Sequence, residues 1–204
     1  MKSNGIIKIA RDVWNSFISN ANMTGIINTD EPYYNLADNV SRGVFSDVIC
    51  CNVLVIDNSF SMNWGDCPPS RLAAAIKAAE AFIRKRAQVS PRDIVSVVSF
   101  NVRGHIVIEP TSIASNETIV FNLNKIRASG GTDLRAGLQT AWETINTGTP
   151  KTQAIRILFL TDGQGGNPLR LAKKIKKHGV LIEAIGFAGN RKEVNEKILR
   201  KMVT

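Results

Sequence analysis

The sequence has few cysteine, histidine and aromatic residues, and this scarcity excludes several kinds of site. Its 204 residues include three cysteines and two histidines, and 6% are aromatic. Cys50, Cys51 and Cys67 are odd in number and have no C-x-x-C spacing, so we expect neither a disulfide framework nor a zinc site. Neither His105 nor His178 lies near a candidate nucleophile in the predicted layout, which argues against a Ser-His-Asp arrangement.

Signals for membranes and for nucleotides are also missing from the sequence. No apolar stretch reaches the ~18 residues that a membrane-spanning helix needs. Residues 1–20 mix charged and apolar residues and have no small-residue cleavage site, so we expect no secretory signal and a reducing cytoplasmic location. The P-loop pattern G-x-x-x-x-G-K-[ST] is absent, and nucleotide hydrolysis therefore has no support.

The sequence does have an ample apolar fraction and an uneven distribution of charge. Hydrophobic residues make up 44% of the chain, enough for one ordinary domain with a short extension. The net charge is +9, and residues 169–204 contribute ten basic and three acidic residues to it. This basic end is either a solvated helix face or a surface for nucleic acid or an acidic partner. Phe187 is the single aromatic residue within it, so base stacking has little support.

Strand and helix patterns alternate from residue 48 onward. Continuous apolar runs predict buried strands at 48–56, 94–100, 155–160 and 180–187. Helical spacing predicts helices at 71–87 (with Ser70 as N-cap), 117–126, 134–145, 169–178 and 191–202. The short turn at residues 103–104 permits only an antiparallel strand at 105–108. The sequence thus predicts an α/β fold: a mostly parallel sheet with one antiparallel edge strand and helices on both faces.

Residues 1–46 differ from the rest and are predicted to be an N-terminal extension to a domain at 47–204. Apolar residues recur there at helical spacing, which predicts an amphipathic helix containing Ile6, Ile9, Ala10, Val13, Trp14, Phe17 and Ile18. Such a helix either packs on its own domain or binds a partner. Its polar face has too few positive charges for a membrane-surface helix.

Three loops carry oxygen-donor side chains in a suggestive arrangement. Asp57, Ser59 and Ser61 form a D-x-S-x-S pattern after the first strand, Thr132 opens a helix, and Asp162 follows a later strand. The carboxyl ends of parallel strands meet at one edge of a sheet, where ligands bind in open α/β folds. Hard oxygen donors favour Mg²⁺, with Mn²⁺ or Ca²⁺ possible, over zinc or copper. In isolation, the first loop is also compatible with a solvated turn that caps a helix.

Together, the order of elements and the three loops resemble the von Willebrand factor A (vWA) domain from about Val48 to Met202. The resemblance implies a Rossmann-like fold and the family's metal-ion-dependent adhesion site (MIDAS), with the ligands Asp57, Ser59, Ser61, Thr132 and Asp162. In that family, an Asp or Glu side chain of a partner protein typically completes the metal coordination. Met62 fits the intracellular branch, whose members often act as adaptors for AAA+ ATPases or other protein machines.

The resemblance further implies a non-catalytic interaction module, with Phe60, Trp64 and Asp66 as a candidate contact rim. Members of the family commonly continue into another strand after the last helix. Either this sheet has five strands, or a segment of residues 1–46 completes it.

Two other functions are compatible with parts of the sequence. The basic C-terminal helices are the basis for an RNA-binding domain. A Mg²⁺-dependent phosphatase is the second alternative, with Asp57 as an aspartyl nucleophile. Haloacid-dehalogenase-type phosphatases carry a second Asp two positions later, where this chain has Ser59, so catalysis is the weaker alternative.

Overall fold

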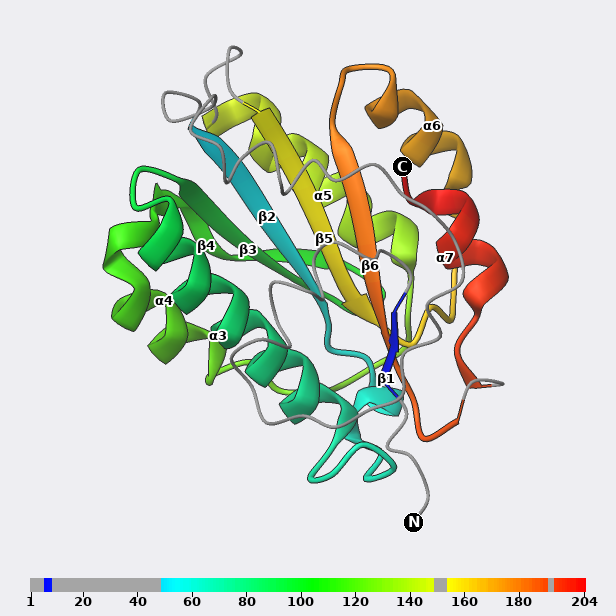
Figure 1. Cartoon of the computed structure of the whole chain (residues 1–204). Coiled ribbons are helices and arrows are strands. Elements are labelled where there is room, and N and C mark those ends of the chain that lie inside the picture. The colour runs from blue at the N-terminus through cyan, green and yellow to red at the C-terminus, as the bar shows by residue number, and fades with distance from the viewer. Residues whose placement is uncertain (1–5, 9–48, 149–153, 191–192) are drawn as a thin grey trace, which may run out of the picture.

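One central sheet organises the protein, which we describe from a computed structural model covering residues 6–8, 49–148, 154–190 and 193–204 (Figure 1). Within these residues the sheet has six strands in the order β1-β6-β5-β2-β3-β4. The strands are β1 (Ile6–Lys8), β2 (Cys50–Asp57), β3 (Ile94–Phe100), β4 (Gly104–Ser112), β5 (Ala154–Thr161) and β6 (Leu181–Phe187).

The strand directions confirm the predicted mixed sheet. β2 runs parallel to both β3 and β5, and β5 runs parallel to β6. β4 pairs antiparallel with β3 at one edge, as the short turn before it requires. β4 is longer than predicted, because its pairing with β3 continues to Ser112.

At the opposite edge of the sheet, the position of Ile6 differs from prediction. The same edge shows which of the two predicted alternatives for the sheet, five strands or a strand added from residues 1–46, is correct. Ile6 was predicted to belong to an amphipathic helix, but Ile6–Lys8 form β1, which pairs antiparallel with residues 185–187 of β6. Without a neighbouring strand, β6 would have unpaired backbone N–H and C=O groups at this edge, and β1 pairs with them. The β-branched residues Ile6 and Ile7 favour a strand conformation. Residues 1–46 therefore supply the sixth strand. The rest of the apolar stripe, from Ile9 to Ile18, lies outside the described residues.

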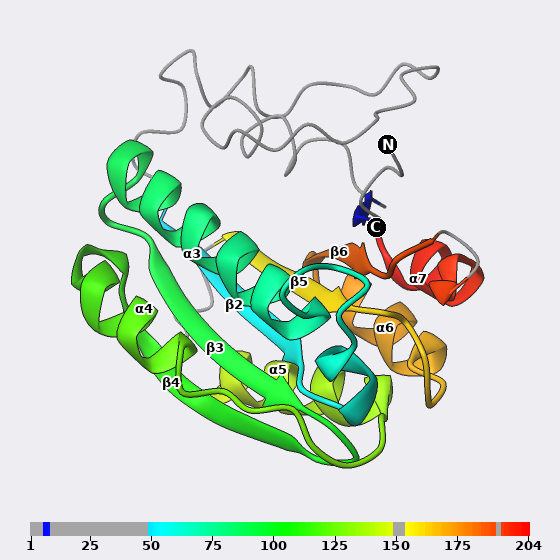
Figure 2. The ribbon, with the colours of Figure 1, turned by 90° about the horizontal axis from the view of Figure 1, so that it is seen from below.

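Helices cover both faces of the sheet, as predicted. α3 (Arg71–Val89) and α4 (Asn116–Leu123) pack on one face, while α5 (Leu134–Gly148), α6 (Leu169–Lys176) and α7 (Glu196–Met202) pack on the other. Figure 2 shows α3 on one side of the sheet and α5 and α6 on the opposite side. Alternate residues of β2 pack in the two hydrophobic cores: Leu54 and Ile56 face α3, and Val53 and Val55 face α5.

Each helix differs from its predicted range by a few residues at one or both ends, most of all α4 and α7. The last helix begins at Glu196 rather than residue 191, because the Asn195 side chain caps it by accepting a hydrogen bond from Ile198 N at 3.3 Å. α4 ends at Leu123, and residues 124–126 form turns. The start of α3 agrees with prediction, since the Ser70 hydroxyl accepts a hydrogen bond from Ala73 N at 3.1 Å.

Candidate metal centre

The three loops predicted to form a site meet at the carboxyl edge of the sheet, which faces the viewer in Figure 2. The parallel pairing of β2 and β5 sets Ile56 opposite Leu160, so the loops that follow these strands leave the sheet side by side. Backbone hydrogen bonds tie the first loop to the second, from Phe60 N to Gly130 O at 2.9 Å and from Ser129 N to Asn58 O at 2.7 Å. The sheet register therefore brings together segments about one hundred residues apart.

Asp57 is the most deeply fixed residue of the first loop. Its carboxylate is buried, and one oxygen accepts a hydrogen bond from Ser59 N at 2.9 Å while the other accepts from the Thr161 hydroxyl at 2.6 Å. Burial raises the pKa of Asp57 to about 6, although these hydrogen bonds oppose the rise. The chain thus holds a carboxylate whose charge is incompletely compensated by its protein neighbours.

Ser61 joins the first loop to the third. After Ser59 the chain forms a short 3₁₀ helix, η1 (Phe60–Asn63), which turns the Ser61 hydroxyl toward Asp162. Ser61 Oγ donates to Asp162 Oδ2 at 2.6 Å and lies 3.3 Å from Ser59 Oγ. Asp162 is fully buried, and its Oδ1 accepts a hydrogen bond from Gln164 N at 3.0 Å. Four of the five predicted ligands are therefore within one local hydrogen-bonded cluster.

Thr132, the fifth predicted ligand, lies against the third loop and is half-buried. Its backbone is packed closely against Gly165, where a Cβ atom would come within 2.3 Å of the Thr132 carbonyl oxygen. Gly165 also has a φ of 76°, a conformation that favours glycine. Leu134 N donates to Gly165 O at 3.4 Å, so the second and third loops are linked at Thr132 and directly after it.

The donor set fits a hard divalent cation. Two carboxylates and three hydroxyls offer oxygen atoms alone, which suits Mg²⁺ and disfavours zinc or copper. Among the described residues there is no group of three or more His, Cys, Asp and Glu side chains that could hold a metal ion, so the candidate site depends on its hydroxyl donors. No disulfide joins the three cysteines, all of which are described, as the sequence predicted.

Arg71 is a residue of this site that the sequence analysis missed. Its side chain is only 1% exposed, and its guanidinium forms ion pairs with Asp162, Asp66 and Glu193. Burial opposes its charge, but the hydrogen bond and charge of Asp66 keep the pKa of Arg71 above its usual value. A cation in the first turn of a helix opposes the helix dipole. The unfavourable position of this arginine, directly after the Ser70 cap, is the feature of the sequence from which its role could have been predicted.

Two of the three residues predicted to form a contact rim are exposed. Phe60 is 65% exposed and Trp64 50%, and Val102, which contacts the second loop at Gly131, is 57% exposed. Trp64 also packs on its own domain, because the Arg71 guanidinium lies 4.6 Å from the centre of its ring. Asp66 differs from the prediction, since its carboxylate is held by Arg71 and by Gly189 N at 2.8 Å. The rim is therefore apolar, around a polar centre.

Comparison with protein families gives one match across more than half of the chain. The family model of the von Willebrand factor type A domain matches residues 52–164, a range that contains all five predicted ligands.

Individual relatives are more distant. The chain is 31% identical over 143 residues to calcium-activated chloride channel regulator 3A-1 of Mus musculus, a match that covers 69% of this chain and 15% of that protein. It is 29% identical over 145 residues to the 26S proteasome regulatory subunit RPN10 of Saccharomyces cerevisiae, covering 69% of this chain and 53% of the subunit. The chain thus spans at most about half the length of these relatives.

A solved structure shows the same fold. The crystal structure of the conserved hypothetical protein BatB from Bacteroides thetaiotaomicron superposes with a TM-score of 0.63, covering 76% of this chain and 85% of that one at 16% identity. No helix in the described part of the chain combines the length and apolar character needed to cross a bilayer.

Proposed function

The chain belongs to the von Willebrand factor type A domain family, and from this premise we propose that it is a non-catalytic module that binds a partner protein through a divalent cation. The proposed ligands are Asp57, Ser59, Ser61, Thr132 and Asp162. The observation that carries the proposal is the 2.6 Å hydrogen bond between Ser61 and Asp162, which joins two loops 101 positions apart in one oxygen-rich cluster.

The residue types explain why such a site would bind an anionic partner. Asp57 and Asp162 together balance the double charge of the cation, while the hydroxyls of Ser59, Ser61 and Thr132 add oxygen atoms without adding charge. A bound cation of this kind supplies a positive centre that a further carboxylate can coordinate. We therefore propose that the partner offers an Asp or Glu side chain, and that Mg²⁺ is the physiological ion, with Mn²⁺ or Ca²⁺ as substitutes.

The environment of Asp57 supports binding rather than catalysis. Both of its carboxylate oxygens accept hydrogen bonds and its side chain is fully buried, which leaves it poorly placed for nucleophilic attack on a phosphate ester. Position 59, where a phosphatase of the haloacid-dehalogenase type would carry an acid/base Asp, is a serine whose side chain is also buried.

The proposed setting is a cytoplasmic protein complex. RPN10 of yeast is, by name, a regulatory subunit of the 26S proteasome, and 29% identity to it supports an adaptor role in a multiprotein machine. We propose that complexes containing an AAA+ ATPase are the first place to look for the partner. The apolar rim of Phe60, Trp64 and Val102 suits a protein surface better than a small molecule.

The test is a comparison of two buried carboxylates. Mg²⁺ and Mn²⁺ binding is measured by isothermal titration calorimetry for the wild type, Asp57→Asn and Asp93→Asn. Asp93 is also buried, but it lies at the start of β3, at the end of the sheet opposite the carboxyl ends of the parallel strands. We expect binding by the wild type and Asp93→Asn, and none by Asp57→Asn. Equal binding by all three proteins would contradict the proposal.

The partner is then sought by affinity capture from lysate in Mg²⁺ and in EDTA. A protein retained by the wild type in Mg²⁺, but lost with EDTA and with Asp57→Asn, supports metal-bridged docking. The same proteins retained under every condition would show that contacts do not pass through the metal site.

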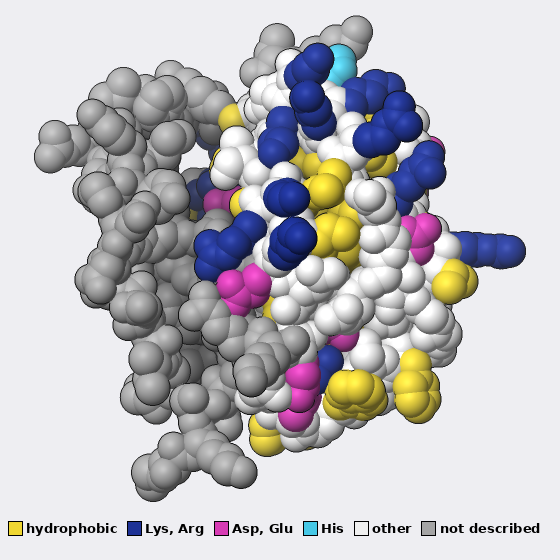
Figure 3. All heavy atoms as spheres, turned by 90° about the vertical axis from the view of Figure 1, so that its right-hand side faces the viewer, with side chains coloured by type: hydrophobic (Ala, Val, Ile, Leu, Met, Phe, Trp, Pro, Cys, Tyr) yellow, Lys and Arg dark blue, Asp and Glu magenta, His cyan; other side chains and the backbone are white. Residues whose placement is uncertain are grey.

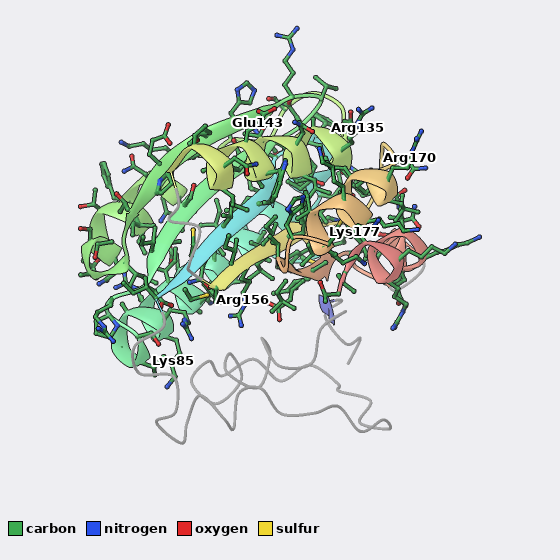
Figure 4. The ribbon with its side chains drawn as sticks, turned by 90° about the horizontal axis from the view of Figure 1, so that it is seen from above. Lys85, Arg135, Glu143, Arg156, Arg170 and Lys177 are labelled. Carbon is green, nitrogen blue, oxygen red and sulfur yellow. The ribbon has the colours of Figure 1, made fainter. Side chains whose placement is uncertain are left out.

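A second candidate function, RNA binding, is favoured by the basic face of α6 and α7. This face, which we define as Arg170, Lys173, Lys174, Lys177, Lys197 and Lys201, is exposed throughout. Figure 3 shows Lys and Arg side chains gathered over the upper part of this side of the molecule, and Figure 4 shows Arg170 on α6 and Lys177 directly after it. Among the described residues, no carboxylate forms an ion pair with Lys173, Lys174 or Lys177, and a polyanion would complement this charge.

Phosphate-driven binding falls steeply with added salt, so fluorescence polarisation with a labelled RNA oligonucleotide at several salt concentrations tests this candidate. We expect charge reversal at Lys173, Lys174 and Lys177 to abolish RNA binding and to leave Mg²⁺ binding intact. Absence of RNA binding by the wild type at low salt would eliminate the candidate.

A further inference from the structure

We propose that Arg71 is a positioning residue of the metal site, whose guanidinium orients Asp162 and connects it to Asp66 and Glu193. The inference rests on the proposed metal binding and adds a residue that lies outside the five predicted ligands. It concerns a part of the molecule where four charged side chains from three segments converge.

The guanidinium is held on all its polar edges. Nη1 donates to Asp162 Oδ2 at 3.2 Å, Nε donates to Asp66 Oδ1 at 2.8 Å, and Nη2 donates to Glu193 Oε2 at 2.5 Å. These partners are separated from Arg71 by 91, 5 and 122 positions in the sequence. The guanidinium also lies over the Trp64 ring, with Cζ 4.6 Å from the ring centroid. Such a planar fork with five donors can bridge several carboxylates, whereas a lysine ammonium is a point charge on a flexible chain.

Asp162 is fixed by donors at both of its oxygens. Oδ2 accepts from the Ser61 hydroxyl and from Arg71, and Oδ1 accepts from Gln164 N at 3.0 Å. Three donors from three segments leave this carboxylate little rotational freedom. Preorganised metal ligands are typically held in this way by the groups around them, and loss of such groups commonly lowers metal affinity about 10–100-fold.

A buried cation beside a metal ligand would, by charge alone, repel a divalent ion. In this cluster, however, the carboxylates of Asp66 and Glu193 outnumber the one guanidinium, so Asp162 does not face a surplus of positive charge. Positioning and repulsion therefore predict opposite results when Arg71 is removed. Loss of positioning weakens metal binding, while relief of repulsion strengthens it.

The far side of the cluster is anchored by backbone contacts. Gly189 N donates to Asp66 Oδ2 at 2.8 Å, and a Cβ at Gly189 would come within 2.6 Å of Asp66 Cβ, so the loop after β6 packs tightly on Asp66. Asn195 N donates to the Asp162 carbonyl oxygen at 3.1 Å. The segment between β6 and α7 thus contacts Asp66 and Asp162 and itself carries Glu193, the third acidic partner of Arg71.

The test measures Mg²⁺ and Mn²⁺ affinity by calorimetry for the wild type, Arg71→Met and Arg71→Lys. We expect both variants to bind about 10-fold or more weakly, because lysine retains the charge but cannot bridge the three carboxylates. The matched control is Arg84→Met, which removes an exposed arginine of the same helix that pairs with Glu117, and we expect it to bind like the wild type. Tighter binding by Arg71→Met, or wild-type affinity in Arg71→Lys, would overturn the inference.

Arg71 is buried, so a variant that also preserves the fold is needed. The Glu193 side chain is 38% exposed, and Glu193→Gln removes one charge of the cluster without opening the core. We expect weaker metal binding than in the wild type, with an unchanged far-ultraviolet circular dichroism spectrum in EDTA. For every folded variant, the readout is the shift in Tm between EDTA and Mg²⁺, which a purely structural defect would not reduce.

The outcomes separate this inference from the proposed function. Metal binding by the wild type, with equal affinity in Arg71→Lys and Glu193→Gln, would overturn the role of Arg71 alone. Absence of metal binding by the wild type would overturn the proposed function and this inference together.

Discussion

The two ends of the sheet each bury carboxylates paired with an arginine, but only the carboxyl end adds side-chain hydroxyls around them. At the start of β3, Asp93 accepts hydrogen bonds from Cys50 N and Asn52 Nδ2, both at 3.1 Å, and from Arg86 Nε at 2.9 Å. At the carboxyl edge, Asp57 is surrounded by hydroxyls and one backbone amide, and Asp162 by a hydroxyl, a backbone amide and Arg71.

This difference shows how one residue type serves two purposes. The charge of Asp93 is met directly by Arg86 and by two neutral donors, so it needs nothing from outside the chain. Hydroxyls can both donate and accept, so Ser59, Ser61 and Thr132 add acceptor oxygens to the carboxylates beside them. The carboxyl edge thus has a surplus of acceptors, which is the composition that a cation requires.

The largest expected effect is on stability at the amino edge. Asp93→Asn leaves Arg86 without its buried counter-charge, and removal of one partner of such a pair typically costs about 3 kcal/mol. Urea unfolding in EDTA measures the loss. The same assay on Asp57→Asn is the contrast, because no cation is stranded there, and we expect a smaller loss. An equal loss in both variants would break the distinction between the two edges.

The next effect is the stabilisation of the wild type by metal. Saturation with Mg²⁺ at one hundred times Kd should raise the free energy of unfolding by about 2.7 kcal/mol. We expect this gain to persist in Asp93→Asn and to vanish in Asp57→Asn, as measured by urea unfolding with and without Mg²⁺. If Mg²⁺ stabilised Asp57→Asn as it does the wild type, the acceptor-rich edge would not be the metal site.

The third effect is the difference between two glycine substitutions, which isolates overpacking at the carboxyl end of the sheet. Gly165 and Gly179 have similar φ values of 76° and 78°, but a Cβ at Gly165 would meet the Thr132 backbone, whereas a Cβ at Gly179 would meet nothing within 4 Å. The strained φ alone costs roughly 1 kcal/mol, and overpacking adds about 1–3 kcal/mol. Thermal unfolding of Gly165→Ala and Gly179→Ala isolates the second contribution. Equal losses in Tm would show that the loops at Thr132 adjust freely.

The smallest effect concerns the thiols near each edge. Burial raises the pKa of both Cys50 and Cys67 to about 11, so neither is a thiolate at neutral pH, and we expect slow labelling of the native protein. Asp93 holds the backbone amide of Cys50, and Asp93→Asn should therefore speed labelling of Cys50 more than of Cys67. Mass spectrometry after brief iodoacetamide treatment distinguishes the two. A uniform increase would indicate global rather than local opening.

Much of the fold could be predicted because its signals are local. Apolar runs such as 94–100 mark strands buried on both faces, and β3 occupies that range. The spacing of apolar residues from Leu72 to Ile83 indicated a helix, and α3 is that helix. The short turn after β3 required an antiparallel β4. Local rules failed at Ile6, where pairing with the edge of β6 outweighed a helical pattern.

The sequence by itself determined the chemistry of the candidate metal site, since the spacing of Asp57, Ser59 and Ser61 and the placement of Thr132 and Asp162 at element ends are local properties. Only the tertiary structure decided how those residues are held. Arg71 contacts Asp162 and Glu193 across 91 and 122 positions, and the Ser61–Asp162 bond spans 101. No periodicity or motif encodes contacts at such separations, because they arise when the parallel register of β2 and β5 brings their loops together and the packing of α3 buries its first residue between them.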